Sequence, residues 1–455
     1  MNSSESNAKR DGFTTGLGVL FATLGSAVGL GNIWKFPYMT GANGGAAFLI
    51  VYLLSTILVG LPVMISEHML GRKARADAIT TLRKLAPKGQ PWWLVGAAGA
   101  IASFLIMAFY TEVAGWVFAY IFKAFSGAIL TTDSNQTASA FTTLITSPLW
   151  SLVWQWIVLA WIAFIIIRGV SKGIEATTKR LMPILFVLLV IICIRSLTLP
   201  GAVQGLEFLF KPDFTKLTKD SLLIAMGLAF FKLSIGMGTM ITYGSYFRDD
   251  QNIPITATRV MLADLTVSIL AGIAIFPAVF AYGFKPDAGP SLLFITIPTV
   301  FASMPLGHLM MVLFFILTGI AATGAMLSLL EVPVAYLNEQ FNMTRTKATL
   351  ITVGLLALIG STAALSNSTL ANFKLFDKTM FDLFDYISSN ILLPVGGFFI
   401  CIFVGWVWGG KQVKDALSNE GKLNNEGIIR LFLGITKFIA PVLILIVLLD
   451  GLGVI

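Results

Sequence analysis

The sequence predicts an all-α membrane protein with eleven transmembrane helices. Of its 455 residues, 56% are hydrophobic and 12% are charged, whereas an ordinary soluble domain has about 25% charged residues. The mean hydropathy is +0.84, and apolar stretches long enough to cross a bilayer recur along the whole chain. A water-soluble protein is therefore excluded.

Apolar windows of about 20 residues, bounded by charges or by Pro, Gly and Asn clusters, define the expected spans. The first window follows Lys9 and Arg10 but stays apolar too long for a cleaved secretory signal, so we expect a retained helix. The expected spans are 13–37, 43–70, 95–124, 148–167, 181–199, 221–247, 256–283, 306–337, 347–365, 381–409 and 430–450.

Basic residues are distributed unequally between the two sets of loops. Loops on the side of the N-terminus contain 20 Lys and Arg, and the opposite loops contain eight. Because cytoplasmic loops are enriched in Lys and Arg, we predict a cytoplasmic N-terminus and, after eleven spans, an outside C-terminus. This asymmetry explains the net charge of +8, so no nucleic-acid partner is implied. The longest loops, 127–147 and 200–220, should face outward and are too short to form enzymes or binding domains.

Residue types that bind metals or form disulfide frameworks are scarce. The two cysteines, Cys193 and Cys401, lie in apolar runs, and with only two histidines, His68 and His308, no metal cluster is expected. The sequence contains neither a phosphate-binding glycine motif nor metal-ligand spacing, which argues against an enzyme.

Two glycine clusters interrupt the first and the sixth span. They cover residues 25–32 (GSAVGLGN) and 232–239 (KLSIGMGT). Each Gly lowers helix stability by about 1 kcal/mol relative to Ala, so paired clusters five spans apart predict matched helix breaks. Free amides attract an anion and free carbonyls a cation, and together they suit a zwitterion. Close helix packing by small residues is the alternative explanation.

Six segments of the chain form recognisable motifs. They are 25–37 (GSAVGLGNIWKFP), 43–48 (NGGAAF), 60–71 (GLPVMISEHMLG), 230–238 (FFKLSIGMG), 241–249 (ITYGSYFRD) and 328–336 (SLLEVPVAY). Together they resemble the neurotransmitter:sodium symporter family, over nearly the whole chain. The resemblance implies one transporter domain, 1–455, with a leucine-transporter-like fold in which 1–199 and 221–409 are inverted repeats and 430–450 is an extra span. The implied function is alternating-access uptake of a small amino acid across a bacterial inner membrane.

The resemblance also implies a substrate site around the two breaks. Its side-chain pocket is apolar with one aromatic lid and an adaptable methionine, so we expect a neutral aliphatic or aromatic amino acid. Packing alone is the alternative role for Tyr110 and Phe231. The implied carboxylate partners are Leu30, Gly31 and Tyr110, and the amino-group partners are Ala27, Phe231, Lys232 and Ser234. The implied side-chain partners are Ser26, Ile106, Tyr110, Phe231, Met237, Ala325 and Leu329.

Charged residues match the gate positions of the family. Lys35 and Asp385 correspond to the outer pair, and Arg10 and Glu339 correspond to the inner pair. Tyr246 matches an inner-gate tyrosine. Partly wet pairs contribute only about 0–1 kcal/mol, which is weak enough to break once per cycle. Ordinary snorkelling charges near helix ends are the alternative.

The ion sites depart from the family pattern. The first sodium site has Lys232 and Asp264 where the family has a hydroxyl residue and Asn, and the second has Gly324 and Ala325 where it has two hydroxyl residues. Our hypothesis is that Lys232 is a tethered cation that replaces the first sodium ion. A permanent structural pair of Lys232 with Asp264 is the alternative. The sodium contributors that remain are Gly25, Ala27, Val28, Asn32 and Ala321.

Sodium symport is therefore the expectation from the family, whereas proton coupling or no coupling is the expectation from these site residues. Chloride is not expected, because Leu228 replaces a polar position of the animal members' chloride site, although Tyr52 and Ser268 match it. A membrane sensor without transport is a weaker alternative, since such proteins usually carry an output domain. We assign no role to Glu112, and the oligomeric state is not predicted.

Overall fold

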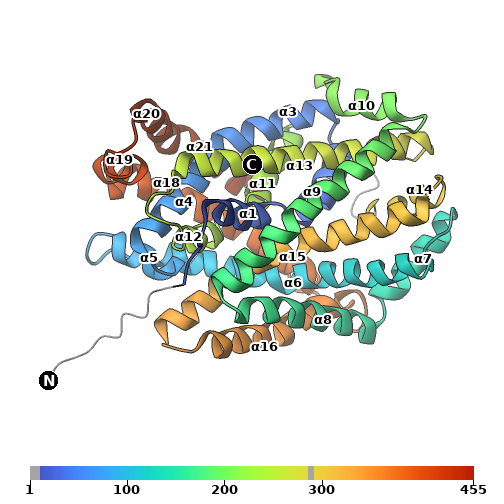
Figure 1. Cartoon of the computed structure of the whole chain (residues 1–455), viewed down its shortest axis with the longest axis horizontal. Coiled ribbons are helices and arrows are strands. Elements are labelled where there is room, and N and C mark those ends of the chain that lie inside the picture. Colours follow the sequence, from blue (N-terminus) through green and yellow to red (C-terminus); the bar gives the residue numbers. More distant parts are fainter. Residues whose placement is uncertain (1–10, 285–291, 455) are drawn as a thin grey trace.

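The computed structural model describes residues 11–284 and 292–454. The described residues form helices and no strands, and most helices run along the long axis of the molecule (Figure 1). Nine helices are long and apolar enough to cross a membrane, and the bent pair Gly16–Ala27 and Gly31–Ala42 brings the described residues to ten candidate spans. The predicted all-α membrane fold is confirmed.

The sixth predicted span, 221–247, is present as two short helices. These are α11 (Lys219–Lys232) and α12 (Thr239–Gly244), separated by residues 233–238. Each is shorter than the roughly 20 residues that a continuous transmembrane helix needs. Helix length therefore supports up to ten spans, and the count of eleven requires that α11 and α12 form one broken span.

The remaining spans follow the predicted apolar windows, and several contain short π-helical turns. The third, seventh and eighth are α6 (Trp93–Phe125), α13 (Ile253–Ala281) and α15 (Gly307–Gln340). The first comprises α1 (Gly16–Ala27), η1 (Gly31–Lys35) and α2 (Phe36–Ala42), and the second α3 (Ala46–Ser55), η2 (Thr56–Gly60) and α4 (Leu61–Ala74). The fourth, fifth and ninth are α8 (Pro148–Ile167), η3 (Val170–Glu175) with α9 (Ala176–Leu197), and α16 (Arg345–Ala364) with η6 (Leu365–Asn367). The last two comprise α17 (Met380–Asp385), η7 (Tyr386–Leu392), α18 (Leu393–Ile402) and η8 (Phe403–Trp408), then α20 (Glu426–Gly434), η9 (Ile435–Ile439) and α21 (Ala440–Gly451).

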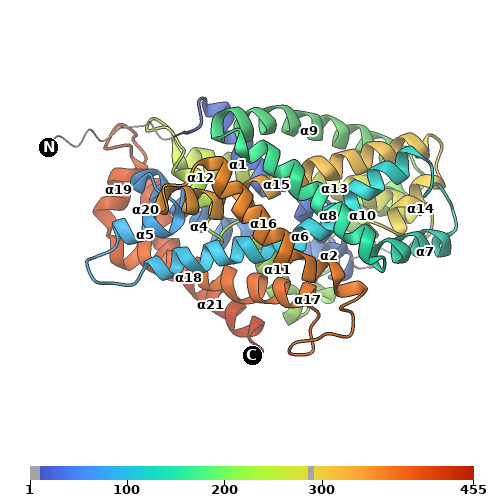
Figure 2. The same cartoon turned by 90° about the horizontal axis from the view of Figure 1, so that it is seen from below.

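Short helices between the spans gather at two opposite ends of the bundle (Figures 1 and 2). We call these ends the α7 end and the α5 end. The two long loops predicted to share one side, 127–147 and 200–220, both lie at the α7 end. The helices at the α7 end are α7 (Ser134–Ile145), α10 (Ala202–Phe210) and α14 (Thr296–Ala302), and those at the α5 end are α5 (Ala78–Leu85) and α19 (Gly410–Leu417).

The outer helices expose apolar side chains, whereas the inner helices bury theirs. Trp156 of α8, Ile194 of α9 and Leu358 of α16 are exposed, and most of the apolar window of α15 is buried inside the protein. A large apolar exterior is rare in soluble proteins and is expected where lipid is the solvent. All residues of α12 are buried, so this helix lies in the protein-lined centre, where an interrupted backbone is tolerated.

Gly71 allows α4 and α12 to touch, and this contact can be tested. A Cβ at position 71 would lie 1.9 Å from the Ile241 carbonyl oxygen, whereas a Cβ at Gly354 of α16 would meet no atom within 4 Å. We expect Gly71→Ala to destabilise the protein, because overpacking typically costs about 1–3 kcal/mol. Gly354→Ala should be neutral or stabilising, since Ala favours helix by about 1 kcal/mol. Thermal unfolding in detergent measures both, and equal unfolding midpoints for the two variants would contradict the close contact.

Candidate functional site

The first helix break leaves backbone groups of the first span without helical partners. α1 ends at Ala27, and the chain turns by 50° before Gly31–Ala42 continues the span. The Leu30 amide donates to Tyr110 Oη at 2.8 Å, and the Gly29 amide donates to Asn32 Oδ1 at 3.2 Å. The predicted interruption of span 1 is confirmed.

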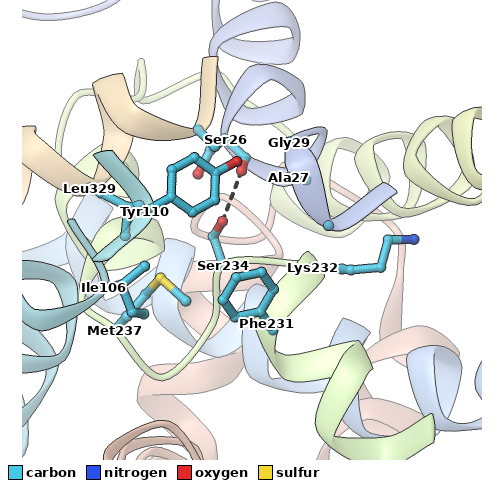
Figure 3. A pocket seen from close by; sticks show the side chains of 12 residues that line it. Ser26, Ala27, Gly29, Ile106, Tyr110, Phe231, Lys232, Ser234, Met237 and Leu329 are labelled. Carbon is cyan, nitrogen blue, oxygen red and sulfur yellow. Dashed lines mark hydrogen bonds between the residues drawn. The ribbon is translucent and has the colours of Figure 1, made fainter. Parts of the chain in front are cut away.

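The second break, residues 233–238, has three residues in the left-handed region. The φ angles are 53° at Ser234, 76° at Gly236 and 75° at Gly238. Glycine adopts such angles without steric cost, which explains why the segment is rich in it. The two breaks touch, because Ser234 Oγ donates to the Ser26 carbonyl at 2.8 Å (Figure 3). The predicted interruption of span 6 is confirmed as well.

Side chains from two other helices bind the backbone of the second break. Ser103 Oγ of α6 donates to the Met237 carbonyl at 2.7 Å, and Glu67 Oε1 of α4 accepts from the Gly236 amide at 2.7 Å. Backbone groups at membrane depth need such partners, because no water replaces the lost helical hydrogen bonds. Specific side chains of neighbouring helices therefore stabilise the second break.

A small cavity lies where the two breaks meet α6 and α15 (Figure 3). It is lined by eleven of the twelve residues that the sequence analysis assigned to a substrate. Leu30 does not line it, but its amide is bonded to the lining residue Tyr110. The lining residues are Ser26, Ala27, Gly29, Gly31, Ile106, Tyr110, Phe231, Lys232, Ser234, Met237, Ala325 and Leu329. The structure thus brings the predicted residues together, and their binding role remains a prediction.

Gly29 is a lining residue that the sequence analysis missed. A Cβ there would lie 2.8 Å from Tyr110 Oη and 2.9 Å from the Ala325 Cβ, so a larger residue would force the cavity wall to move. Its position between two other glycines of the first cluster was the available signal.

Lys232 lines the cavity with its carbon chain, but its ammonium group points away from it (Figure 3). The ammonium donates to Tyr52 Oη at 2.8 Å, to Asp264 Oδ2 at 3.2 Å and to Ser268 Oγ. Asn32 Nδ2 donates to the other Asp264 oxygen at 2.6 Å. Neither charged side chain has any exposed surface. We call these five residues the Lys232 cluster.

The Lys232 cluster joins both broken spans to two further helices. Lys232 is the last residue of α11, Asn32 lies in η1, Tyr52 in α3 and Asp264 in α13. The ring of Tyr52 lies 4.6 Å from Lys232 Nζ, and the ring of Phe36 lies 4.9 Å from it. The pair is neutral as a whole and fully hydrogen-bonded, which is the condition under which a buried ion pair is tolerated.

At the second predicted sodium site, α1 and α15 are in direct contact. A Cβ at Gly324 would lie 2.6 Å from the Gly25 carbonyl oxygen, so this oxygen already touches the α15 backbone. Ala325 adds only a methyl group. Neither position supplies a side-chain oxygen.

The predicted outer gate pair is present. Lys35 Nζ lies 3.4 Å from Asp385 Oδ1 and 4.0 Å from the centre of the Phe231 ring, which lines the cavity. The side chain of Lys35 is 12% exposed and that of Asp385 is 35% exposed. The pair is thus partly wet and so contributes little to stability, and its role as an outer gate remains a prediction.

The predicted inner pair is not tested, because Arg10 lies outside the described residues. Glu339 Oε2 accepts a hydrogen bond from the Asp77 amide at 2.8 Å, at the start of α5. This carboxylate therefore lies at the α5 end.

Tyr246, the other predicted inner-gate residue, belongs to a buried ionic cluster. Its hydroxyl donates to Glu331 Oε1 at 2.7 Å, and Arg345 binds both Glu331 oxygens at 3.0 and 2.5 Å. The sequence analysis missed Arg345, because the charge pattern of spans 8 and 9 does not show that the two residues face each other. Glu331 is thereby engaged and does not contribute to the second sodium site.

A family model described as the sodium:neurotransmitter symporter family matches residues 10–143 and 139–454. The chain belongs to this family. It is 38% identical to the uncharacterized sodium-dependent transporter YhdH of Bacillus subtilis, over 96% of this chain and 97% of that protein. It is 33% identical to an uncharacterized sodium-dependent transporter of Haemophilus influenzae, over 98% of this chain and 99% of that one.

The structure of MhsT in complex with L-phenylalanine has the same fold as this chain. The TM-score is 0.90 and the identity is 42%, covering 97% of this chain and 100% of the other. The predicted leucine-transporter-like fold is confirmed, and the relatives are transporters rather than enzymes.

Loss of one partner of the Lys232–Asp264 pair should be strongly destabilising. Asp264→Asn leaves a buried ammonium group without a counter-charge, and breaking a buried pair costs about 3–5 kcal/mol. The double variant Lys232→Met, Asp264→Leu should recover most of this loss, because apolar groups then replace both charges. Thermal unfolding in detergent compares the three proteins. A double variant that is no more stable than Asp264→Asn would contradict a direct pair.

Proposed function

We propose that this protein is a secondary active transporter of neutral amino acids in which the Lys232–Asp264 pair takes the place of a bound sodium ion. The family gives the transporter class, and the cavity lining supports the substrate type. The lining side chains are apolar or hydroxyl-bearing except for Lys232, whose ammonium group points elsewhere (Figure 3). An uncharged side chain is the kind that such a wall accommodates. The related MhsT structure contains L-phenylalanine, a ligand of this kind.

The two breaks supply partners for both charged groups of an amino acid. The Gly31 amide of the first break suits the carboxylate, and carbonyls at Ala27 and Phe231 suit the amino group. Tyr110 Oη accepts its hydrogen bond from the Leu30 amide, so the hydroxyl proton is left to donate to a carboxylate. These contacts are the ones on which substrate recognition depends in our proposal.

The residues at the first sodium position do not fit a sodium ion. A hard cation requires several oxygen ligands, and here the Tyr52, Asp264 and Ser268 oxygens all bind the Lys232 ammonium. Asn32 Oδ1 is bonded to a backbone amide as well. A second positive charge close to Lys232 would be repelled strongly, because the site is buried and weakly screened.

The second sodium position does not fit either. Gly324 and Ala325 supply no side-chain oxygen, and the Gly25 carbonyl packs directly on Gly324. Three backbone carbonyls, at Gly25, Val28 and Ala321, are too few for a hard cation. Transport is therefore driven by protons or proceeds as sodium-independent exchange in our proposal, and we derive no step through a bound sodium ion.

The charge asymmetry of the loops gives the orientation. We place the α5 end in the cytoplasm and the α7 end outside, because Lys and Arg are concentrated in the loops of the α5 end. The Lys35–Asp385 contact then closes the cavity from the outside, and the segment around Tyr246 closes it from the cytoplasm. A bacterial inner membrane is the setting that this orientation and the bacterial relatives support.

The deciding experiment measures uptake into proteoliposomes that contain the purified protein. Labelled L-phenylalanine and a labelled mixture of neutral amino acids are offered under a sodium gradient, and then under a proton gradient in sodium-free buffer. We expect accumulation or exchange without sodium. Accumulation that depends on sodium would overturn the role of Lys232, and failure to bind or transport any neutral amino acid would overturn the substrate class.

Restoring the family residues at the first site should restore sodium dependence. In Lys232→Thr, Asp264→Asn the tethered cation is gone and two neutral oxygen ligands are present, so sodium should stimulate substrate binding. Lys437→Thr, which removes a lysine of η9, serves as the control and should leave ion dependence unchanged. Binding of L-phenylalanine at graded sodium concentrations measures both. Identical sodium responses of the two variants would refute the proposed replacement.

Removal of the Tyr110 hydroxyl should weaken substrate binding. Hydrogen bonds to charged groups contribute about 1.5–3 kcal/mol, so Tyr110→Phe should lower L-phenylalanine affinity by about 10- to 100-fold. The control is Tyr120→Phe on the same helix, because the buried Tyr120 hydroxyl has no hydrogen-bond partner among the described residues. Equilibrium binding compares the two. If both variants bind like the wild type, Tyr110 has only a packing role.

A further inference from the structure

Glu112 of α6 is a buried carboxyl group that the proposed transport cycle does not use. Glu112 is 1% exposed, and no cationic side chain of the described residues forms an ion pair with it. Trp116, one turn further along α6, donates its indole N–H to Glu112 Oε1 at 2.7 Å. The other oxygen, Oε2, has no hydrogen-bond partner among the described residues. An ionisable residue at this depth costs about 2.5–3.5 kcal/mol, so its presence calls for a function.

The interface of α6 with α8 contains a second acceptor without a donor. Gln155 of α8 donates its amide N–H groups to Thr111 Oγ1 at 3.2 Å and to the Ala108 carbonyl at 3.4 Å, while its Oε1 is buried and has no partner. An ionised Glu112 would add one more acceptor and an uncompensated charge. A protonated Glu112 carries no charge, which removes the larger of these penalties, and it has an O–H donor in place of one acceptor.

The indole that Glu112 holds is the centre of an aromatic cluster at the α7 end. The Trp116 ring lies 5.4 Å from Phe141 of α7, 5.8 Å from Phe294 just before α14, and 6.1 Å, stacked, from Phe381 of α17. Phe141 and Phe294 stack on each other at 4.8 Å. One ring thus contacts three segments that lie far apart in the sequence.

This aromatic cluster is connected to the outer gate. Phe381 is the second residue of the short helix α17, which ends at Asp385, the partner of Lys35. Phe381 also contacts Phe109, the neighbour of the cavity residue Tyr110, at 5.4 Å. A rotation of Trp116 would therefore displace the helix that carries the gate carboxylate.

We propose that Glu112 is a neutral positioning residue whose hydrogen bond fixes the Trp116 ring and thereby holds α7, α14 and α17 together over the outer end of the cavity. One oxygen of the neutral carboxyl accepts a hydrogen bond from the indole N–H, and the other oxygen carries the carboxyl proton. The inference does not depend on the coupling ion or on the substrate. It rests on the proposed function only in that the α7 end must open and close.

Hydrogen–deuterium exchange of the purified protein in detergent tests this role without a transport assay. In Glu112→Leu and in Trp116→Phe, which keeps an aromatic ring but loses the N–H, exchange in residues 292–302 and 380–385 should be about five- to tenfold faster, because one hydrogen bond of the closed state is lost. Glu112→Gln is neutral, and its side-chain oxygen can still accept the hydrogen bond from the indole N–H, so this variant should exchange like the wild type. Residues 410–417 at the α5 end serve as the internal control and should not change in any variant.

Three results would overturn the proposal. Wild-type exchange in Glu112→Leu and Trp116→Phe would show that the hydrogen bond does not hold these segments. Fast exchange in Glu112→Gln would show that the ionised form is required. Faster exchange at residues 410–417 as well would show a general loss of stability. If Glu112→Leu does not fold, Trp116→Phe and Glu112→Gln decide alone. If the wild-type protein takes up no neutral amino acid, the proposed function is contradicted. The conclusions from these exchange results are not affected.

Discussion

A polypeptide inside a bilayer must satisfy every backbone hydrogen-bonding group from within the protein, and the rest of this structure depends on that constraint. Two of its spans break this rule locally, and the protein supplies the missing partners. Glu67 and Ser103 bind the backbone of the second break, and Tyr110 and Asn32 bind that of the first. The two breaks line one small cavity, and our proposal places the substrate there and not along the long intact helices.

The same constraint applies to charge. Lys232 ends α11 at the second break, where a bound cation would otherwise neutralise Asp264 and the partial charges of the exposed backbone ends. Here a lysine covalently attached to the chain supplies that positive charge, and Asp264 supplies the negative one. A cation that is covalently tethered to the chain cannot leave into either compartment as a free ion can. In our proposal, the energy that a sodium gradient gives to relatives must therefore come from another source, such as proton transfer or exchange of substrates.

Separate buried polar clusters lie towards the two ends of the bundle, and each one fixes a different contact. The Glu331–Arg345 pair binds Tyr246 towards the α5 end, while Glu112 binds Trp116 under the aromatic cluster of the α7 end. The Lys232 cluster lies between them at the breaks. Buried polar networks specify one arrangement strongly, because a half-satisfied network is costly. The three clusters are thus suited to keeping distinct closed contacts at each end while the centre changes its access.

The sequence by itself determined the fold class, the order of the spans and the two interruptions, because hydrophobicity and glycine content act locally and are read without neighbours. It also determined most of the residues that meet at the cavity, though not Gly29, through the resemblance of motifs such as 25–37 and 230–238. Only the tertiary structure decided where the Lys232 ammonium points, that Gly25 packs on Gly324, and that Arg345 binds Glu331. The direction of a long side chain and the distance between two helices result from packing between segments far apart in the chain, and no local pattern encodes them.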